Sequence, residues 1–283
     1  MSKTKKYIYL IAVFIILVVV IKSFFSFNER KNELYKKTEN SLYKIFDEKL
    51  QAKEDVAISS SIILSINSNI KKALKNNDRK LAFKELESLD NIYKKYTKFH
   101  NIKIHIHTKD LYSFLRVWSP DKYGDYLGDF RPTIVWVKNN KKPLVSLEVG
   151  RSGLVIRGIS PVIDDGEYLG SIEFIQGLNS ISRDLLKENV YLVILMKKEY
   201  LNIAKFLSSN EIIDQYIVAL KKDSFNHQFV EEIKKDIYKL DEKKYIITKN
   251  FFAIKIPLRD FESNIIGYAI IGESIKQLNR ILK

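Results

Sequence analysis

The segment EVGRSGLVIRGISPV, residues 148–162, combines the pattern of buried β-strands with three charged side chains. Its apolar residues lie on both sides of a glycine-containing turn, as in two strands joined by a hairpin. The charged residues are Glu148, Arg151 and Arg157. A charged group inside a protein is costly unless it is ion-paired or meets a charged ligand. The segment therefore predicts a sheet whose charged residues either pair with one another or line a ligand site.

Strand patterns continue on both sides of this segment. Isoleucines at 102, 104 and 106 alternate with Lys103, His105 and His107, as in a strand with one apolar face and one polar face. We expect one antiparallel sheet of about five strands packed behind long helices, with Trp136 as a core residue of its strand. The predicted strands are NIKIHIHT (101–108), TIVWV (133–137), LVSLEVG (144–150), GLVIRGISPVI (153–163) and YLGSIEFI (168–175).

The second half of the chain repeats this pattern. The stretches ISPVIDDGEYLGSIEF (159–174) and IKIPLRDFESNIIGYAIIGE (254–273) share a strand, a proline, a short acidic turn and a glycine-containing strand with an acid. Such self-similarity predicts an internal repeat of one α/β unit. In the second unit we expect polar helical segments centred on residues 210–222 and 230–240.

The N-terminus predicts a membrane anchor. Residues 7–27 carry no charge before Lys22 and are long enough to cross a bilayer as a helix. Lysines in the preceding tail, residues 1–6, predict that this tail is cytoplasmic. A cleaved signal peptide is the alternative, but the Lys-Ser-Phe-Phe-Ser-Phe sequence after the apolar core is a poor cleavage site. The chain has no cysteine, which excludes disulfides and a lipoprotein anchor.

Residues 28–98 read as a helical stalk, without glycine or proline. Leu42, Phe46 and Leu50 recur at helical spacing, and Asn77-Asp78 can cap a second helical stretch. A stripe at Leu86, Leu89, Tyr93 and Tyr96 fits either an intramolecular core or a helix that pairs with its copy in a homodimer. The pattern alone leaves both interpretations open.

The net charge and a pair of histidines bear on whether the chain binds nucleic acid or a metal. The net charge of +14 comes mostly from lysines scattered along the whole chain, which indicates a compositional bias and not a nucleic-acid site. His105 and His107, two apart on one strand face, could bind a metal, but the sequence shows no clear third ligand. We therefore interpret them as polar residues on the open face of a strand, where they could also point into a pocket, and we expect no metal and no cofactor.

Four motifs in this order resemble the extracytoplasmic double Cache sensor regions of bacterial chemoreceptors and membrane sensor proteins. They are SFLRVW (113–118), GDYLGDFR (124–131), EVGRSGLVIRGISPV (148–162) and GSIEF (170–174). The resemblance implies an α+β fold: a transmembrane helix and a long helix, then two stacked antiparallel-sheet modules of PAS-like type. The implied boundaries are a membrane-distal module at 99–186, a membrane-proximal module at 187–273 and the start of a C-terminal helix at 274–283.

The resemblance also implies a site. In amino-acid-binding relatives, an arginine and a tryptophan separated by one residue hold the ligand carboxylate, and Arg116 and Trp118 match that pair. Ser119 stands where those relatives carry a tyrosine, and Tyr112 lies one residue nearer the arginine, so carboxylate binding is better supported than amino-acid specificity. The expected contacts are Arg116, Trp118, Tyr123, Asp125 and Arg131, with Arg151, Arg157 and Glu173 as second choices.

The charged residues have an alternative role. Arginine suits a carboxylate ligand, but internal pairs such as Arg157 with Glu173 and Arg151 with Glu148 would use the same groups.

The sequence carries no nucleophile elbow, zinc-protease motif, P-loop or dinucleotide fingerprint. We therefore expect that the protein is not an enzyme.

We predict a single-pass inner-membrane sensor of a small anionic or zwitterionic metabolite, with its sensor domain periplasmic or extracellular. Its role would be chemotaxis or transmembrane signalling. Because the chain ends at Lys283 without an output domain, we expect half of a split or truncated receptor that acts through a signalling partner. The alternative is a scaffold protein of a membrane complex that binds no ligand.

Overall fold

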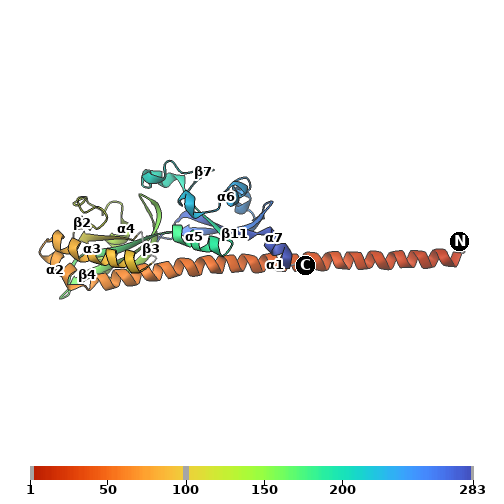
Figure 1. The fold of residues 1–283 in the computed structure, drawn as a ribbon, viewed down its shortest axis with the longest axis horizontal. Helices are drawn as coiled ribbons and strands as arrows, with labels where there is room; N and C mark the ends of the chain where they lie inside the picture. The colour runs from red at the N-terminus through yellow and green to blue at the C-terminus, as the bar shows by residue number, and fades with distance from the viewer. Residues whose placement is uncertain (1–2, 98–101, 282–283) are drawn as a thin grey trace.

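The computed structural model describes residues 3–97 and 102–281, apart from the side chains of residues 3–10, 12 and 241. One helix, α1, runs along the whole molecule and extends far beyond the rest of it toward the N-terminus (Figure 1). The helices are α1 (Lys3–Ser65), α2 (Ser68–Lys75), α3 (Arg79–Tyr96), α4 (Pro132–Asn140), α5 (Asn179–Lys187), α6 (His227–Lys234) and α7 (Ile275–Ile281).

Two antiparallel sheets pack along α1, and the first sheet lies at the end of α1 farthest from the N-terminus (Figure 1). The strand order is β2-β1-β5-β4-β3 in the first sheet and β7-β8-β6-β11-β10-β9 in the second. When β7 is left out and the strands of each sheet are numbered in chain order, both sheets have the spatial order 2-1-5-4-3. This agreement is consistent with the predicted internal repeat. The strands of the first sheet are β1 (Lys103–Thr108), β2 (Ser113–Arg116), β3 (Leu144–Gly150), β4 (Gly153–Asp164) and β5 (Glu167–Gly177). Those of the second are β6 (Val190–Lys197), β7 (Ile212–Ile213), β8 (Tyr216–Val218), β9 (Tyr245–Ile247), β10 (Phe251–Arg259) and β11 (Ile265–Ser274).

The predicted membrane segment, 7–27, belongs to α1, but residues 7–10 and 12 lie outside the side chains that are described. Among the described residues, no helix meets the length and hydropathy that a membrane span requires.

The two faces of the first sheet differ in polarity. Ile104, Ile106, Ile156 and Phe174 lie on the face that packs against α1 and are buried in the main hydrophobic core. Helix α4 packs on β3, β4 and β5 from the other side. A smaller apolar cluster at Leu111, Leu127, Ile134, Val137 and Ile159 holds this cover in place.

Glycine allows α1 to approach β4 closely. A Cβ atom at Gly158 would collide with the backbone of Ala57 in α1, so only glycine fits at this crossing. One helical turn further along α1, the hydroxyl of Ser61 forms a buried hydrogen bond of 2.8 Å with the hydroxyl of Ser160 in β4. The helix therefore contacts the sheet backbone directly at this point.

Two sequence predictions of secondary structure are wrong. The predicted strand TIVWV is helix α4, and β2 supplies the fifth strand instead. Pro132 occupies the first turn of α4, where its missing N–H is harmless, and Ile134 and Val137 are buried at helical spacing. The segment 210–222, predicted as helical, forms the short β7–β8 hairpin, with its turn at Asp214 (φ 54°). The predicted cap is confirmed, since the Asp78 side chain accepts the Leu81 N–H at 3.0 Å at the start of α3.

Candidate functional site

The face of the first sheet that α4 covers is lined by polar side chains. The β1–β5 register sets His105 opposite Glu173 and His107 opposite Ser171. Because side chains alternate along a strand, these four residues share one face, the one opposite the apolar core. All four are buried. Buried polar groups are retained only with hydrogen-bond or charge partners, so this face is where binding chemistry would be found.

Four charged side chains meet on this face: Arg131, Glu148, Arg157 and Glu173, here called the charge cluster. Glu173 lies 2.7 Å from Arg131 and 3.1 Å from Arg157, measured between side-chain nitrogen and oxygen. Glu148 lies 3.3 Å from Arg131 and 2.7 Å from Arg157. Each is less than 9% exposed. Two positive and two negative groups sum to zero, so Glu148 and Arg157 of the 148–162 segment are ion-paired within the chain.

The ionisation of Glu173 follows from its neighbours. Burial opposes the charged form, but Arg131 and Arg157 outweigh it and hold the pKa of Glu173 well below its usual range. The carboxylate is therefore ionised at neutral pH. The second pairing expected from the sequence, Glu148 with Arg151, is wrong, since Glu148 contacts Arg131 and Arg157.

The two histidines of β1 join the charge cluster through Glu173. His105 Nδ1 lies 3.0 Å from Glu173 Oε1, and His107 Nε2 lies 3.1 Å from His105 Nδ1. The other ring nitrogens contact hydroxyls, His105 Nε2 that of Ser113 and His107 Nδ1 that of Ser171, each at 2.8 Å. Burial, aided by His107, lowers the pKa of His105 to about 3, so this imidazole is neutral at pH 7. Both rings are buried, so the interpretation of these histidines as residues of an open strand face is wrong.

A second charged pair lies at the edge of the same face, where it meets solvent. Arg116 and Asp125 form a bidentate pair, with both nitrogen–oxygen distances at 2.7 Å. The Asp125 side chain is 42% exposed, in contrast to the charge cluster. Hydrogen bonds from Arg116 lower the pKa of Asp125. We call this pair, together with Trp118 and Lys103, the rim.

Trp118 connects the rim to the buried residues. Its ring meets the His105 ring edge-on at 5.9 Å between centroids, and Lys103 Nζ lies 5.3 Å from the Trp118 ring centre. Tyr123 lies apart from them, beneath the guanidinium of Arg79, which is 3.1 Å from its ring centre. The predicted site residues thus divide between the rim and the charge cluster, except for Tyr123 and Arg151, which belong to neither.

Lys103 is a residue that the sequence prediction missed. Its ammonium group is half-buried. Burial lowers the pKa of Lys103, and the positive charge of Arg157 lowers it further. No carboxylate of the described residues forms an ion pair with it. Its position in the alternating Lys103-Ile-His105-Ile-His107 stretch was the available signal, since it shares the face of the two histidines.

Arg151 does not join the other predicted residues. It is exposed in the β3–β4 turn, and its carbonyl oxygen accepts the Phe206 N–H at 3.1 Å. This contact belongs to the boundary between the two sheets, because Phe206 precedes the second-sheet strand β7.

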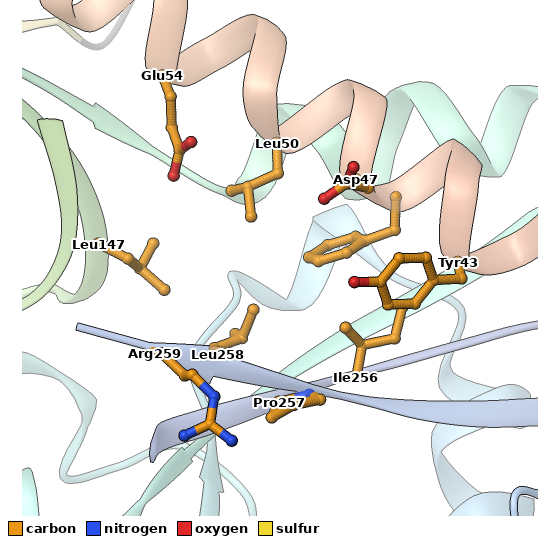
Figure 2. A pocket seen from close by; sticks show the side chains of 10 residues that line it. Tyr43, Asp47, Leu50, Glu54, Leu147, Ile256, Pro257, Leu258 and Arg259 are labelled. Carbon is orange, nitrogen blue, oxygen red and sulfur yellow. The ribbon is translucent and has the colours of Figure 1, made fainter. Parts of the chain in front are cut away.

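A separate cavity of about 110 Å³ lies between α1, β3 and β10 (Figure 2). Asp47 and Glu54 reach into it from α1, and Arg259 lies on β10 at the opposite side. Burial and the nearby Asp47 raise the pKa of Glu54. None of the ligand-site residues predicted from the sequence lines this cavity, so it is distinct from the polar face of the first sheet.

Comparison with known proteins gives a family match and structural likenesses. A family model described as the double sensory domain of two-component sensor kinases, dCache_3, matches residues 35–278. No curated protein matches the sequence significantly.

Among solved structures, the sensor domain of the Vibrio cholerae histidine kinase DctB is 11% identical, with a TM-score of 0.53 over 87% of this chain and 98% of that one. A domain of a sensory box/GGDEF family protein from Vibrio parahaemolyticus is 14% identical, with a TM-score of 0.48 over 88% and 99%. The ligand-binding domain of the Pseudomonas fluorescens chemoreceptor CtaA, in complex with L-isoleucine, is 10% identical, with a TM-score of 0.45 over 90% of this chain and 98% of that domain. At these identities the DctB likeness supports the fold alone.

Proposed function

The chain belongs to the double Cache family of sensory domains, and from that premise we propose that its first-sheet module senses a small anionic or zwitterionic metabolite outside the cytoplasm. The observation that carries this proposal is the partly open Arg116–Asp125 pair beside Trp118 and Lys103. A guanidinium fork, an aromatic wall and an ammonium group without an ion-pair partner among the described residues are suited to a carboxylate-containing molecule.

The rim is favoured over the charge cluster on energetic grounds. Exchanging Asp125 for a ligand carboxylate breaks a partly exposed ion pair, and such pairs contribute about 0–1 kcal/mol. Breaking one partner out of the buried Arg131–Glu173 pair would cost about 3–5 kcal/mol. We therefore assign ligand contact to Arg116, Trp118 and Lys103, and a supporting role beneath them to the charge cluster, including Arg131, Arg157 and Glu173.

The pairing also bears on the charge of the ligand. When a carboxylate takes the Arg116 fork, Asp125 is released and can accept an ammonium group of the same molecule. Lys103 would meet a second acidic group if the ligand has one. A zwitterion fits the first arrangement and a dicarboxylate fits the second, and both retain the same contact to Arg116.

Membrane anchoring through residues 7–27 is part of the proposal. Large apolar side chains between residues 11 and 27 of α1 are exposed, on a segment that projects away from the rest of the molecule (Figure 1). A water-soluble surface rarely exposes so continuous an apolar stretch. The lysines at 3, 5 and 6 favour a cytoplasmic N-terminus, which would leave both sheets outside the cytoplasm. We further propose that the chain forms a homodimer through α1 and signals through a partner protein, in chemotaxis or another transmembrane response.

The test is a thermal-shift screen of the full chain in mild detergent against organic acids, amino acids and amines. We expect one class of compound to raise the melting temperature, and Arg116→Ala to abolish that shift. Arg280→Ala, an exposed arginine on α7, is the matched control and should retain it. Arg151→Ala should also retain it, because Arg151 lies away from the rim. A shift unchanged by Arg116→Ala would refute the site. No shift with any compound, together with a stable membrane partner in pull-downs, would favour the scaffold alternative.

A further inference from the structure

Three potential metal ligands converge on the polar face of the first sheet. They are His105, His107 and Glu173, and one nitrogen or oxygen atom of each lies within 4.8 Å of the other two. All three side chains are buried. The register between β1 and β5 creates this group, because it aligns Glu173 with a His-x-His pair that lies 66 or more residues earlier in the sequence. We propose that these three residues bind a divalent transition-metal ion such as Zn²⁺.

The spacing of the three atoms supports this assignment. The Nδ1 atom of His105 is 3.0 Å from Glu173 Oε1, His107 Nε2 is 3.5 Å from the same oxygen, and the two nitrogens are 3.1 Å apart. Ligands of a tetrahedral zinc ion, bound at about 2.0–2.2 Å, are themselves separated by about 3.3 Å. An ion at that bonding distance from all three atoms would lie slightly out of their plane, which leaves a fourth position open.

Two serines hold the imidazole rings in the required orientation. Ser113 contacts His105 Nε2 and Ser171 contacts His107 Nδ1, both at 2.8 Å. When these hydroxyls accept a hydrogen bond from the imidazoles, His105 Nδ1 and His107 Nε2 carry bare lone pairs directed at the space beside Glu173. Metal-bound histidines characteristically donate their second ring N–H to such an outer partner, which fixes the tautomer.

The charge cluster limits the affinity of this site without preventing binding. Arg131 and Arg157 repel a second cation, but each also reaches Glu148, at 3.3 and 2.7 Å. The second oxygen of Glu173, Oε2, lies 2.7 Å from Arg131 and 3.2 Å from Arg157, so it can keep both guanidinium groups paired while Oε1 faces the ion. Two imidazoles and one carboxylate with an open position suit Zn²⁺, Fe²⁺ or Co²⁺. Mg²⁺ and Ca²⁺ are disfavoured because they prefer ligand sets made of oxygen atoms. We expect micromolar affinity, weaker than that of a closed structural zinc site.

The test uses the full chain in detergent, without a polyhistidine tag and stripped with a chelator. Titration with Co²⁺ should give visible d–d absorption that saturates at one equivalent, and Zn²⁺ should displace it. His105→Gln and His107→Gln should each lower the affinity at least about tenfold. His227→Gln, an exposed histidine at the start of α6, is the matched control and should change nothing.

Two results would overturn the proposal. One is the absence of saturable one-to-one binding by the wild-type chain, in which case the histidines share a proton with Glu173 and hold no ion. The other is an affinity equal to that of the wild type in both His105→Gln and His107→Gln. If either variant unfolds, Ser113→Ala and Ser171→Ala take its place, because they leave the ligands intact. We expect about a 10- to 100-fold loss of affinity from each serine variant, and an unchanged affinity would count against the site.

Discussion

The fold should lose stability when the charge of the buried Glu173 carboxylate is removed, even by the replacement of a single atom. The substitution Glu173→Gln keeps the shape of the side chain and removes its charge. Arg131 and Arg157, which lie 2.7 Å and 3.1 Å from Glu173, are then left to share the single carboxylate of Glu148. Removing one partner of a buried ion pair costs about 3–5 kcal/mol, since it leaves an uncompensated charge. For a domain of this size, that loss corresponds to a fall in melting temperature of about 6–20 °C.

Fluorescence offers a local readout of this loss. The chain contains two tryptophans, Trp118 next to β2 and Trp136 in α4, and both belong to the first-sheet module. Urea unfolding followed by tryptophan emission, in the presence of a chelator, would therefore report this module alone. Asp125→Asn is the matched control: it breaks a partly exposed pair and should cost less than about 1 kcal/mol. Equal urea midpoints for Glu173→Gln and Asp125→Asn would refute the reasoning.

A double substitution separates charge imbalance from lost contacts. In Arg157→Met/Glu173→Gln, one positive and one negative group are removed together, and Arg131 remains paired with Glu148 at 3.3 Å. The double variant should lose less stability than the sum of the two single variants, by about 1–3 kcal/mol. Simple additivity would mean that the four charges do not act as one unit.

Gly158→Ala should destabilise the fold by about 2 kcal/mol or more, because the new methyl group would collide with the Ala57 backbone of α1; an unchanged thermal unfolding curve would show that α1 can move away at little cost. Asp78→Ala should cost about 1 kcal/mol through loss of the α3 N-cap, and a chemical denaturation midpoint equal to that of the wild type would contradict this. Arg116 lowers the pKa of Asp125, so the pair stabilises the folded chain above the unfolded-state pKa of Asp and this contribution is lost as pH falls through the lowered value. Asp125→Asn should accordingly flatten the acid limb of a stability–pH curve, and an identical limb would argue against the pair.

Four of the five strands of the first sheet, and the apolar and polar faces of β1, could be predicted because their signals are local. Alternation in the 101–108 stretch identifies β1 and its polar face, and the glycine turn in 148–162 identifies the β3–β4 hairpin. The Arg157–Glu173 pair was also foreseeable, since both residues belong to strands joined by a short acidic turn. In each case the interacting residues lie in one strand or in two strands joined by a tight turn.

The errors arise where distant packing decides the structure. The β-branched residues of 133–137 favour a strand, but this segment covers one face of the first sheet. Ile134 and Val137 both join the smaller apolar cluster on that face because helical spacing places them on the same side of α4. Glu148 was assigned the sequence neighbour Arg151, whereas its partners come from β4 and from the residue before α4. The third member of the histidine group, Glu173, depends on the β1–β5 register, which no local pattern encodes.

The arrangement of the faces limits how a binding event could reach the N-terminal part of α1. The rim and the charge cluster lie on one face of the first sheet, and α1 packs on the other, so a change at Arg116 has to pass through the strands themselves. The backbone of β4 approaches the backbone of α1 closely at Gly158 and Ala57, one residue after Arg157. A shift of β4 driven by the charge cluster would therefore act on α1 at a point with no flexible side chain between them. Because α1 is one uninterrupted helix of 63 residues, a displacement at this point is carried along a rigid element and not through a loop.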